Sequence, residues 1–332
     1  MNKNILVTGG AGFIGSNFIP YFCEKYPNYQ IINLDKLTYA GNLDNLKECN
    51  AMSNYTFILG DICDSTLVSK IFEKHAISDV IHFAAESHVD NSIENPRIFI
   101  ETNILGTFTL LENFKKTHKD SNQNRFHHIS TDEVYGTLGI EGSFSEKTAY
   151  APNSPYSASK AGSDMLTRAY FHTYGINAVI SNCSNNYGPK QHAEKLIPTI
   201  ICRAIAEELI PIYGDGKNVR DWLYVIDHCR AIDLIFHNGK IGETYNIGGR
   251  NERTNLQIAY KICDILDRKH PRKSGKRYSE LITFVKDRLG HDRRYAIDAT
   301  KLETELEWKA EENFDTGIIK TIEWYLFKEK LI

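Results

Sequence analysis

The segment that most constrains the fold is GGAGFIG at residues 9–15, which directly follows the apolar run NILVT at residues 4–8. Its glycines, Gly9, Gly12 and Gly15, are three residues apart, and a helical apolar pattern begins within the segment. Glycine permits a tight turn and a close approach of the backbone to a ligand, and the free N–H groups at a helix N-terminus attract a phosphate. A strand, a glycine-rich turn and a helix in this order are typical of a dinucleotide-binding fold.

The same alternation continues through the first 184 residues. Apolar runs lie at residues 30–35, 56–61, 79–85, 125–131 and 177–183, with longer amphipathic stretches between them. The runs are apolar almost throughout instead of at every second position, which favours parallel strands buried on both faces. We therefore predict an α/β fold in which residues 1–184 form a doubly wound parallel sheet, a Rossmann domain.

A second, smaller unit follows. Beyond the first 184 residues Gly and Pro punctuate a mixed region with helical patterns near residues 196–209 and 255–268. We predict a smaller mixed α/β lobe, mainly residues 185–222 and 249–332, that binds substrate. The patterns in residues 223–248 indicate a return to the main sheet, so we expect no single boundary between the two units.

Composition excludes several classes of protein. The 332 residues include 39 Lys and Arg against 42 Asp and Glu, a net charge of −3, so we expect no nucleic acid partner held by phosphate contacts. Hydrophobic residues make up 42% and charged residues 24%, which is typical of globular chains and not of disordered ones.

The cysteines and the N-terminus bear on the compartment. Seven cysteines are scattered without a Cys-x-x-Cys pair, and most of the 12 histidines lack metal-ligand spacing, so we expect neither disulfides nor a metal. No apolar run approaches the ~18 residues of a membrane span, and the chain starts with a strand-like stretch instead of a leader. We expect a cytoplasmic protein with no membrane contact.

Asp35 strengthens the dinucleotide interpretation. It ends the second apolar run, 20 residues after the last glycine of the GGAGFIG segment. A carboxylate at this position accepts hydrogen bonds from the adenosine ribose and repels a 2′-phosphate, which favours NAD over NADP, although Lys36 beside it weakens that preference slightly. Asp61 would reach the adenine side by position alone, or it is a solvated strand end. The small Ala84 and Ala85 end the fourth run and leave room for a cofactor.

A tyrosine and a lysine lie four residues apart in SPYSASK, at Tyr156 and Lys160, on one face of a predicted helix. A lysine ammonium lowers the pKa of a nearby phenol, as a positive nicotinamide ring would, and makes it a usable base near neutral pH. The Tyr-x-x-x-Lys pattern alone is common and usually marks a surface pair. Here Ser130 and Thr131, about 25 residues earlier, end another apolar run, where a hydroxyl can meet the same substrate oxygen as the tyrosine.

Two carboxylates, Asp132 and Glu133, come directly after Thr131. They follow a buried strand, although a charged loop is the plainer interpretation. Adjacent carboxyl groups can divide acid and base work when their surroundings separate their pKa values. An elimination of water needs such a division.

A set of segments extends this pattern over residues 4–325: GGAGFIGS, DKLTYAGN, AAESHVDNSI, STDEVYG, SPYSASKAGSD, NCSNNYGP, EKLIP, RDWLYV, YNIGG and GHDRRYAID. Together they resemble the dTDP-glucose 4,6-dehydratases of the extended short-chain dehydrogenase superfamily. Sugar-nucleotide 4-epimerases resemble this chain too, but without the Asp-Glu pair after Thr131. A 4,6-dehydratase of UDP-glucose or UDP-N-acetylglucosamine would also fit these segments. A cofactor-sensing binding protein on the same fold would be expected to lose Tyr156 or Lys160.

The resemblance implies an internal cycle of oxidation and reduction. Tyr156, aided by Thr131 and Lys160, takes the proton of the glucose 4-hydroxyl while a hydride leaves C4 for NAD. Glu133 then removes the C5 proton and Asp132 protonates the departing C6 hydroxyl, after which the hydride returns to C6. The product is a 4-keto-6-deoxy sugar nucleotide, which feeds rhamnose and other deoxysugars. NAD is regenerated in each turnover and is expected to stay tightly bound.

The resemblance also implies the binding residues. The expected NAD contacts are Gly9, Gly12, Phe13, Ile14, Gly15, Asp35, Lys36, Leu37, Thr38, Asp61, Ile62, Phe83, Ala84, Ala85, Ser87, Thr102, Tyr156, Lys160 and Asn186. The expected contacts of dTDP-glucose are Ser87, Thr131, Asn185, Lys195, Leu196, Pro211, Ile212, Tyr213, Arg220, Asn255, His291 and Arg293. Arginine suits a diphosphate because its fork pairs with phosphate oxygens, although Arg220 and Arg293 seen alone would be surface ion-pair partners.

Two further expectations follow from the resemblance. Members of the family are typically homodimers that pair helices into a bundle, which we expect here from residues 97–118 and 156–174. The chain also departs from its relatives at residues 190–193, which read KQHA where an aromatic residue and a proline are frequent, and at Leu289, where many have proline. These departures bear on the preferred base.

Overall fold

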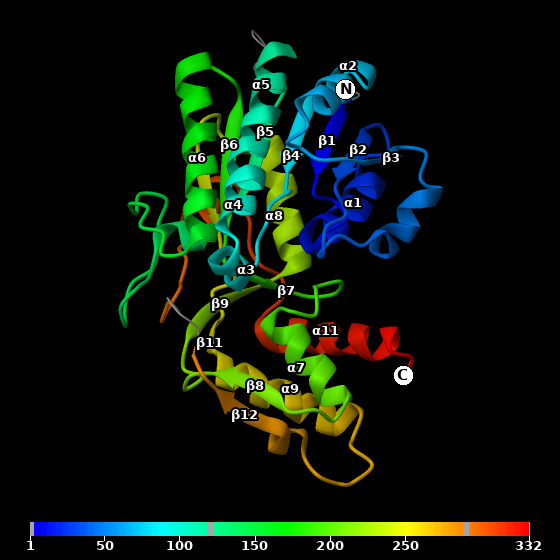
Figure 1. The fold of residues 1–332 in the computed structure, drawn as a ribbon, viewed down its shortest axis with the longest axis vertical. Helices are drawn as coiled ribbons and strands as arrows, with labels where there is room; N and C mark the ends of the chain where they lie inside the picture. The colour runs from blue at the N-terminus through cyan, green and yellow to red at the C-terminus, as the bar shows by residue number, and fades with distance from the viewer. Residues whose placement is uncertain (1–2, 118–122, 288–291, 332) are drawn as a thin grey trace.

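The computed structural model describes residues 3–117, 123–287 and 292–331. The expected positions His291 and Leu289 lie outside the described residues. Two layers of helices enclose a central sheet in the upper part of Figure 1, and a smaller lobe of strands and helices lies below it.

The central sheet confirms the predicted doubly wound parallel fold. Its seven strands run in the order β10-β6-β5-β4-β1-β2-β3, and each pairing is parallel. Their bounds are Asn4–Thr8 (β1), Gln30–Asp35 (β2), Tyr55–Leu59 (β3), Asp79–His82 (β4), Phe126–Thr131 (β5), Ala178–Cys183 (β6) and Thr244–Ile247 (β10). The strand order reverses between β1 and β4, and ligands bind at such a point in open α/β sheets.

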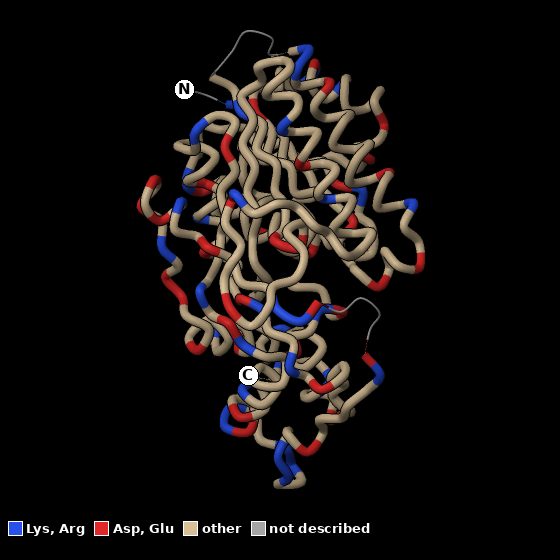
Figure 2. Tube along the Cα trace, turned by 90° about the vertical axis from the view of Figure 1, so that its left-hand side faces the viewer, with Lys and Arg blue, Asp and Glu red and all other residues tan. Residues whose placement is uncertain are grey.

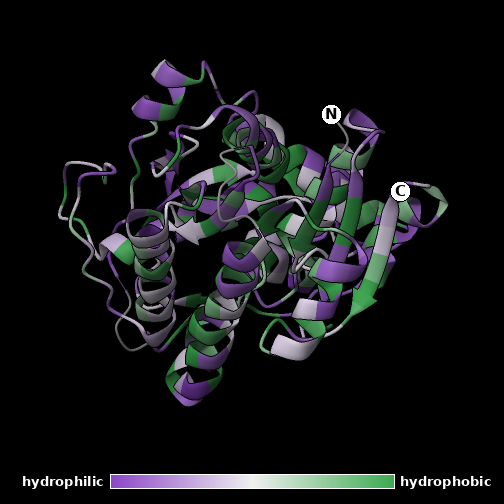
Figure 3. Ribbon diagram, turned by 90° about the horizontal axis from the view of Figure 1, so that it is seen from above, coloured by the Kyte–Doolittle hydropathy of each residue, from purple (hydrophilic) through white to green (hydrophobic). Residues whose placement is uncertain are grey.

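Alternate residues of the first strand face the two helical layers. Ile5 and Val7 pack against α1 (Phe13–Lys25), η1 (Leu43–Ala51) and α8 (Val225–Asn238). Leu6 packs instead against the layer on the other face. That layer consists of α2 (Ser65–Lys74), α5 (Thr107–Thr117) and α6 (Pro155–Tyr174). Figure 3 shows the resulting pattern, with hydrophobic colour concentrated on the strands and mixed colours on the outer helices.

The helix before α5 is continuous in space but changes its winding. The short α3 (Val89–Glu94) and α4 (Pro96–Phe99) lead into a π-helical turn, η2 (Ile100–Gly106), which runs directly into α5. Such turns occur frequently at functional sites. Here the turn carries Thr102 to the cavity described below.

The lobe has its own core and two small sheets. One sheet joins β7 (Asn185–Tyr187), β9 (Val219–Tyr224) and β11 (Glu252–Thr254), and the other joins β8 (Ile210–Tyr213) and β12 (Ile282–Val285). Around them lie α7 (Leu196–Ile205), α9 (Asn255–Lys269), η4 (Tyr278–Leu281) and α11 (Phe314–Lys328). Thr254 caps α9 with Gln257 in a reciprocal pair, so this helix begins where the sequence predicts it. Helix α7 ends earlier than predicted, because Glu207 adopts a left-handed φ of 55° just before β8 begins.

The chain returns to the sheet after its first excursion into the lobe. Helix α8 packs against α1, β10 pairs with β6, and α10 (Thr300–Glu305) then packs on β10. Acidic and basic residues alternate along the outer loops and helices in Figure 2. Within the described ranges, no helix has both the length and the apolar composition that a membrane crossing requires.

Candidate active site

A cavity of about 320 Å³ opens at the carboxyl ends of β1, β2, β4 and β5. The residues that follow these strands line it from the sheet side, and residues 183–195 line it from the side of the lobe. The cavity therefore lies where the strand order reverses, as expected for a ligand site in an open α/β sheet.

The glycine segment forms a cradle that larger residues would fill. Gly9 has a φ of +72°, and a Cβ there would lie 2.5 Å from the backbone nitrogen of Ala84. A Cβ on Gly15 would lie 2.6 Å from the carbonyl oxygen of Gly9. Gly12 is the N-cap of α1, no side chain caps that helix, and its first residues line the cavity. These features fit the pyrophosphate of a dinucleotide.

Asp35 connects the end of β2 to the glycine segment. Its Oδ2 accepts a hydrogen bond from the backbone N–H of Ala11, and its Oδ1 accepts one from that of Leu37, both at 2.8 Å. Burial raises the pKa of Asp35, although the two donors oppose this shift. A carboxyl group held at the cavity wall in this way fits a ribose diol.

Lys36 pairs with Asp61, since their Nζ and Oδ2 atoms are 2.6 Å apart. Burial opposes the shift, but the hydrogen bond from Lys36 lowers the pKa of Asp61. The lysine charge beside Asp35 is therefore matched by Asp61, which limits its attraction for a 2′-phosphate.

The two carboxyl groups after β5 differ in their surroundings. Thr131 caps the short 3-10 turn η3 (Asp132–Tyr135), and its Oγ1 accepts a hydrogen bond from the backbone N–H of Glu133. Asp132 is buried, and its Oδ2 has no hydrogen-bond partner among the described residues. Burial raises the pKa of Asp132 well above its ordinary value, and the charge of Glu133 adds to the shift. A neutral Asp132 can donate a proton at neutral pH.

Tyr156 and Lys160 lie on the first turns of α6, which Ser154 and Ser157 cap reciprocally. Both line the cavity, and the Lys160 Nζ donates a hydrogen bond to the Ile129 carbonyl at 2.8 Å. Burial raises the pKa of Tyr156 well above its ordinary value, Glu133 raises it further, and the Thr131 hydroxyl offsets part of the shift. The lowered tyrosine pKa expected from the sequence is thus not produced by the chain alone, because burial outweighs the attraction of an ammonium that points to a carbonyl.

The lobe contributes polar groups to the same cavity. Lys195 donates a hydrogen bond from Nζ to the Ser87 carbonyl at 3.1 Å, which joins α7 to the loop after β4. The Oδ1 of Asn186 lies 2.9 Å from the Nδ1 of His228, and the Nδ2 of Asn186 donates a hydrogen bond to the Ser184 carbonyl. The cavity wall is therefore continuous from the sheet to the lobe.

The structure brings most of the predicted residues together. Every expected catalytic residue lines the cavity, as does every expected NAD contact except Leu37. Leu37 has a left-handed φ of 54° and packs into the core beneath η1 and α1. Of the expected substrate contacts, the cavity is lined by Ser87, Thr131, Asn185 and Lys195.

The other expected substrate contacts that the structure describes lie outside this cavity. They are Leu196, Pro211, Ile212, Tyr213, Arg220, Asn255 and Arg293. Ile212 is fully buried in the lobe core. The guanidinium of Arg220 lies 4.3 Å from the centre of the Tyr295 ring and donates to backbone carbonyls. Arg293 pairs with Asp215 on the surface.

Sequence reasoning missed several cavity residues. Glu86, Gln191, His192 and Glu194 also line it. Glu86 and Glu194 both lie inside segments that carry the resemblance, AAESHVDNSI and EKLIP. Each is next to a residue predicted to contact a ligand, and this position in the sequence could have identified it. His192 belongs to the departure from the relatives, and its ring packs edge-on against Tyr39 at 5.7 Å. In the chain as described, no group of three His, Cys, Asp or Glu side chains is arranged to hold a metal ion.

Comparisons with known proteins agree with this geometry. The model of the family described as GDP-mannose 4,6 dehydratase matches residues 6–321. A probable dTDP-glucose 4,6-dehydratase of Sinorhizobium fredii is 55% identical over 97% of this chain and 92% of its own length. The crystal structure of a dTDP-glucose 4,6-dehydratase from Bacillus anthracis in complex with NAD has a TM-score of 0.88 and 46% identity, and the match covers 99% of this chain and 98% of that one.

A third relative is similar over the same length. The structure of DesIV, a dTDP-glucose 4,6-dehydratase from Streptomyces venezuelae with NAD and TYD bound, has a TM-score of 0.90 and 43% identity, and the match covers 99% of this chain and 98% of that one. The motifs, the fold and these relatives lead to one conclusion: the chain belongs to the dTDP-glucose 4,6-dehydratase family of the extended short-chain dehydrogenase superfamily.

Proposed function

We propose that the chain converts dTDP-glucose to dTDP-4-keto-6-deoxyglucose with NAD that stays bound and is regenerated in each turnover. The observation that carries this proposal is the pair of carboxyl groups directly after Thr131, of which Asp132 is buried and has a raised pKa. A simple epimerization needs no such acid. The names of the relatives support dTDP-glucose as the substrate.

The cavity walls support the proposed cofactor contacts. The glycine segment would hold the pyrophosphate, Asp35 the adenosine ribose, and Ala84 and Ala85 would leave space beside β4. When bound, oxidised NAD would supply the hydride acceptor for C4 of the sugar, the hydride donor for C6 and a positive charge near the base. The phenolic oxygen of Tyr156 takes the proton of the 4-hydroxyl, with Thr131 hydrogen-bonded beside it.

The elimination of water then uses both carboxyl groups. A ketone at C4 acidifies the C5 proton, which Glu133 removes. Asp132 gives its proton to the departing C6 hydroxyl, because burial raises its pKa and so favours the protonated form. Glu133 gives a proton back to C5 when the hydride returns to C6. Tyr156 then still holds the proton of the 4-hydroxyl and Asp132 lacks the one it gave to water, so the net transfer of one proton from Tyr156 to Asp132 through solvent restores the starting state.

For the nucleotide diphosphate we propose the lobe. Arg220 presents a flat guanidinium braced on Tyr295, which suits paired phosphate oxygens. Residues 211–213 lie in β8, and we place the base beside this strand. The test of this assignment is discrimination between dTDP-glucose and UDP-glucose.

The first experiment follows the proton NMR spectrum of the protein with dTDP-glucose, and separately with UDP-glucose, in heavy water without added cofactor. We expect a C6 methyl signal and deuterium at C5 from dTDP-glucose. A signal from UDP-glucose would shift attention to residues 190–193 and the base. Formation of the galactose isomer without a methyl signal would establish an epimerase and refute the proposed roles of Asp132 and Glu133.

We also propose a homodimer built through α5 and α6. These helices lie side by side on the near face of Figure 1 and contact each other. Their outer surface, with the adjoining π-helical turn, exposes Leu105 at 51%, Phe108 at 44% and Met165 at 49%. Apolar side chains exposed along neighbouring helices favour burial against a second copy.

For the compartment we propose the cytoplasm. All seven cysteines are free thiols, and five of them are buried. Burial raises the pKa of Cys23 and of Cys263 to about 12, so these thiols are unreactive. Unpaired cysteines in this number suit a reducing environment.

A further inference from the structure

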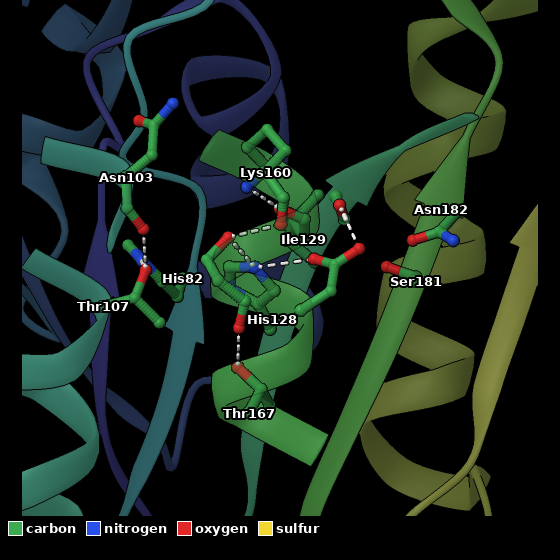
Figure 4. A network of polar contacts seen from close by, with 12 residues as sticks. His82, Asn103, Thr107, His128, Ile129, Lys160, Thr167, Ser181 and Asn182 are labelled. Carbon is green, nitrogen blue, oxygen red and sulfur yellow. Dashed lines mark hydrogen bonds and ion pairs between the residues drawn. The ribbon is translucent and has the colours of Figure 1, made fainter. Parts of the chain in front are cut away.

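A buried network of polar side chains lies behind the cavity, and its central carboxyl group has no place in the mechanism above. Asp164 is on α6, one turn after Lys160, with an exposed fraction of 1%. Its Oδ2 accepts hydrogen bonds from the Ser130 hydroxyl at 2.8 Å and from the Tyr150 hydroxyl at 2.9 Å. Figure 4 shows this region from nearby, with Lys160 pointing to Ile129 above the ring of His128.

The second oxygen of Asp164 also faces a donor. The Ser163 hydroxyl donates its hydrogen to the Lys160 carbonyl at 2.8 Å, so its oxygen only accepts from the Nε2 of His128 at 3.0 Å. The hydrogen of His128 is therefore on Nε2, which lies 3.1 Å from the Oδ1 of Asp164. Burial lowers the pKa of His128 well below its ordinary value, so the ring is neutral. Two donors bond to Oδ2, while Oδ1 lies near the His128 N–H without a hydrogen bond, and accepted hydrogen bonds of this kind suit the ionised form.

Lys160 needs a negative charge nearby. Its side chain has an exposed fraction of 3%, and its Nζ donates to a carbonyl that carries no net charge. Burial lowers the pKa of Lys160, and the charge of Asp164 opposes this shift. Residues four apart on a helix are neighbours, so the two charges share one buried face of α6. An isolated buried ammonium tends to lose its proton.

The remaining titratable groups around this pair do not supply that charge. They are His82 on β4, His128 on β5, Asp132, Glu133 and Tyr135 in η3, Tyr150 in the loop that follows, Tyr156 on α6 and Cys183 on β6. Burial keeps the histidines neutral and raises the pKa of Cys183 to about 12. Asp132 and Glu133 lie on η3 and burial raises the pKa of Asp132, so Asp164 is the carboxyl group that shares a face of α6 with Lys160.

We propose that Asp164 is a positioning residue of the reaction, whose buried carboxylate keeps Lys160 charged beside Tyr156 and fixes Ser130, the residue before Thr131. This inference rests on the proposed function, in which Tyr156 and Lys160 act on the 4-hydroxyl. Asp164 does not line the cavity, so it acts through Lys160 and the end of β5.

The test is the pH profile of the first oxidation, measured as NADH absorbance in a single turnover by Asp164→Asn. The acid limb reports Tyr156 and the alkaline limb reports loss of the Lys160 proton. Removing the anion lowers the pKa of Lys160, so we expect the alkaline limb to move to lower pH by about one unit, a rate loss of about tenfold on that limb. Asp164→Glu keeps the charge and is expected to restore the limb.

Two matched variants separate charge from structure. Tyr150→Phe removes one hydrogen bond to Asp164 but leaves the charge, and Asp233→Asn removes another buried carboxylate, on α8 and paired with Lys25. We expect both to leave the alkaline limb in place. A limb that does not move in Asp164→Asn, or that moves equally in Tyr150→Phe, would overturn the proposal.

A measurement on the unmodified chain covers the case in which Asp164→Asn does not fold. The carboxyl ¹³C signal of Asp164, assigned by its absence in Asp164→Glu, is expected to show an ionised group at pH 7.5 without substrate, since burial raises its pKa only to about 6. A neutral carboxyl group at pH 7.5 would refute the inference. If the unmodified chain forms no C6 methyl signal, the proposed function fails instead, whatever this signal shows.

Discussion

Burial controls the protonation of the individual residues in the cavity. It raises the pKa of both Asp132 and Tyr156, which favours the neutral form of each in the chain alone. This state suits Asp132, which must give a proton, and it leaves Tyr156 dependent on the positive charge of oxidised NAD. The protein alone therefore favours Asp132 as the acid, whereas Tyr156 becomes a usable base only when the cofactor is bound.

Replacing Tyr156 with Phe removes the group that takes the 4-hydroxyl proton. We expect NADH formation on mixing with dTDP-glucose to fall by at least about a hundredfold, the usual contribution of a positioned base. Stopped-flow absorbance measures it directly. Tyr135→Phe, which changes a buried tyrosine bonded to Asn246, serves as the control, and normal NADH formation by Tyr156→Phe would disprove the assignment.

Replacing Glu133 with Gln separates the two chemical steps. The first oxidation should survive, because it does not use Glu133, while exchange of the C5 hydrogen with solvent should fail. Proton NMR in heavy water detects the exchange. Glu146→Gln changes a half-buried carboxyl group outside the cavity and should leave the exchange intact. Full deuterium incorporation by Glu133→Gln would count against its role.

At the scale of helices and strands, the sequence predicts those elements whose pattern is local. The apolar run of β1, the glycine residues of the turn after it and the helical apolar period of α1 can each be recognised without the rest of the chain. The early end of α7 follows from the left-handed φ of Glu207, and the pairing of β9 with β7 and β11 depends on partners distant in sequence. Neither had a local signal.

The same distinction applies to the site. Positions such as Gly9 and Asp35 are predictable because backbone geometry and strand ends restrict the residue type. The raised pKa of Tyr156 was not, since it depends on how deeply α6 is buried and on the direction of the Lys160 side chain. The contact of Arg220 with Tyr295 likewise joins segments far apart in the chain.

The apolar outer face of α5 and α6 yields a prediction about assembly. Replacing Phe108 with Glu places a charge in the proposed interface, so we expect light scattering after size exclusion to show a shift from dimer to monomer at micromolar concentration. Phe327→Glu on α11 changes a side chain that is more exposed, at 72%, but lies on another face. It should remain dimeric. A dimeric Phe108→Glu would place the interface elsewhere.

At the scale of the whole molecule, stability depends on the contact between α1 and α8. Tyr21, Lys25 and Tyr26 on α1 donate hydrogen bonds to Asp233 on α8. Burial would raise the pKa of Asp233, but these three hydrogen bonds and a fourth with His237 lower it to about 2. This pair of helices covers one face of the sheet.

The shift has a definite sign. A lowered folded-state pKa contributes stability above the ordinary value of about 4, and this contribution is lost as the pH falls toward 2. We expect Asp233→Asn to lower the free energy of unfolding by about 2 kcal/mol at pH 7, and by about half as much near pH 3. Urea unfolding at both pH values checks this. An equal loss at both would show that the charge is not responsible.

The path of the chain limits how this protein can be divided. The backbone leaves the sheet after β6, returns at α8, leaves again after β10 and comes back at α10. No cut at one peptide bond separates the sheet from the lobe, and a gene fragment for the sheet alone would have to omit stretches on both sides of α8 and β10. Neither the sheet side nor the lobe side of the cavity is therefore one continuous segment at an end of the chain, so neither can be exchanged as a simple terminal module.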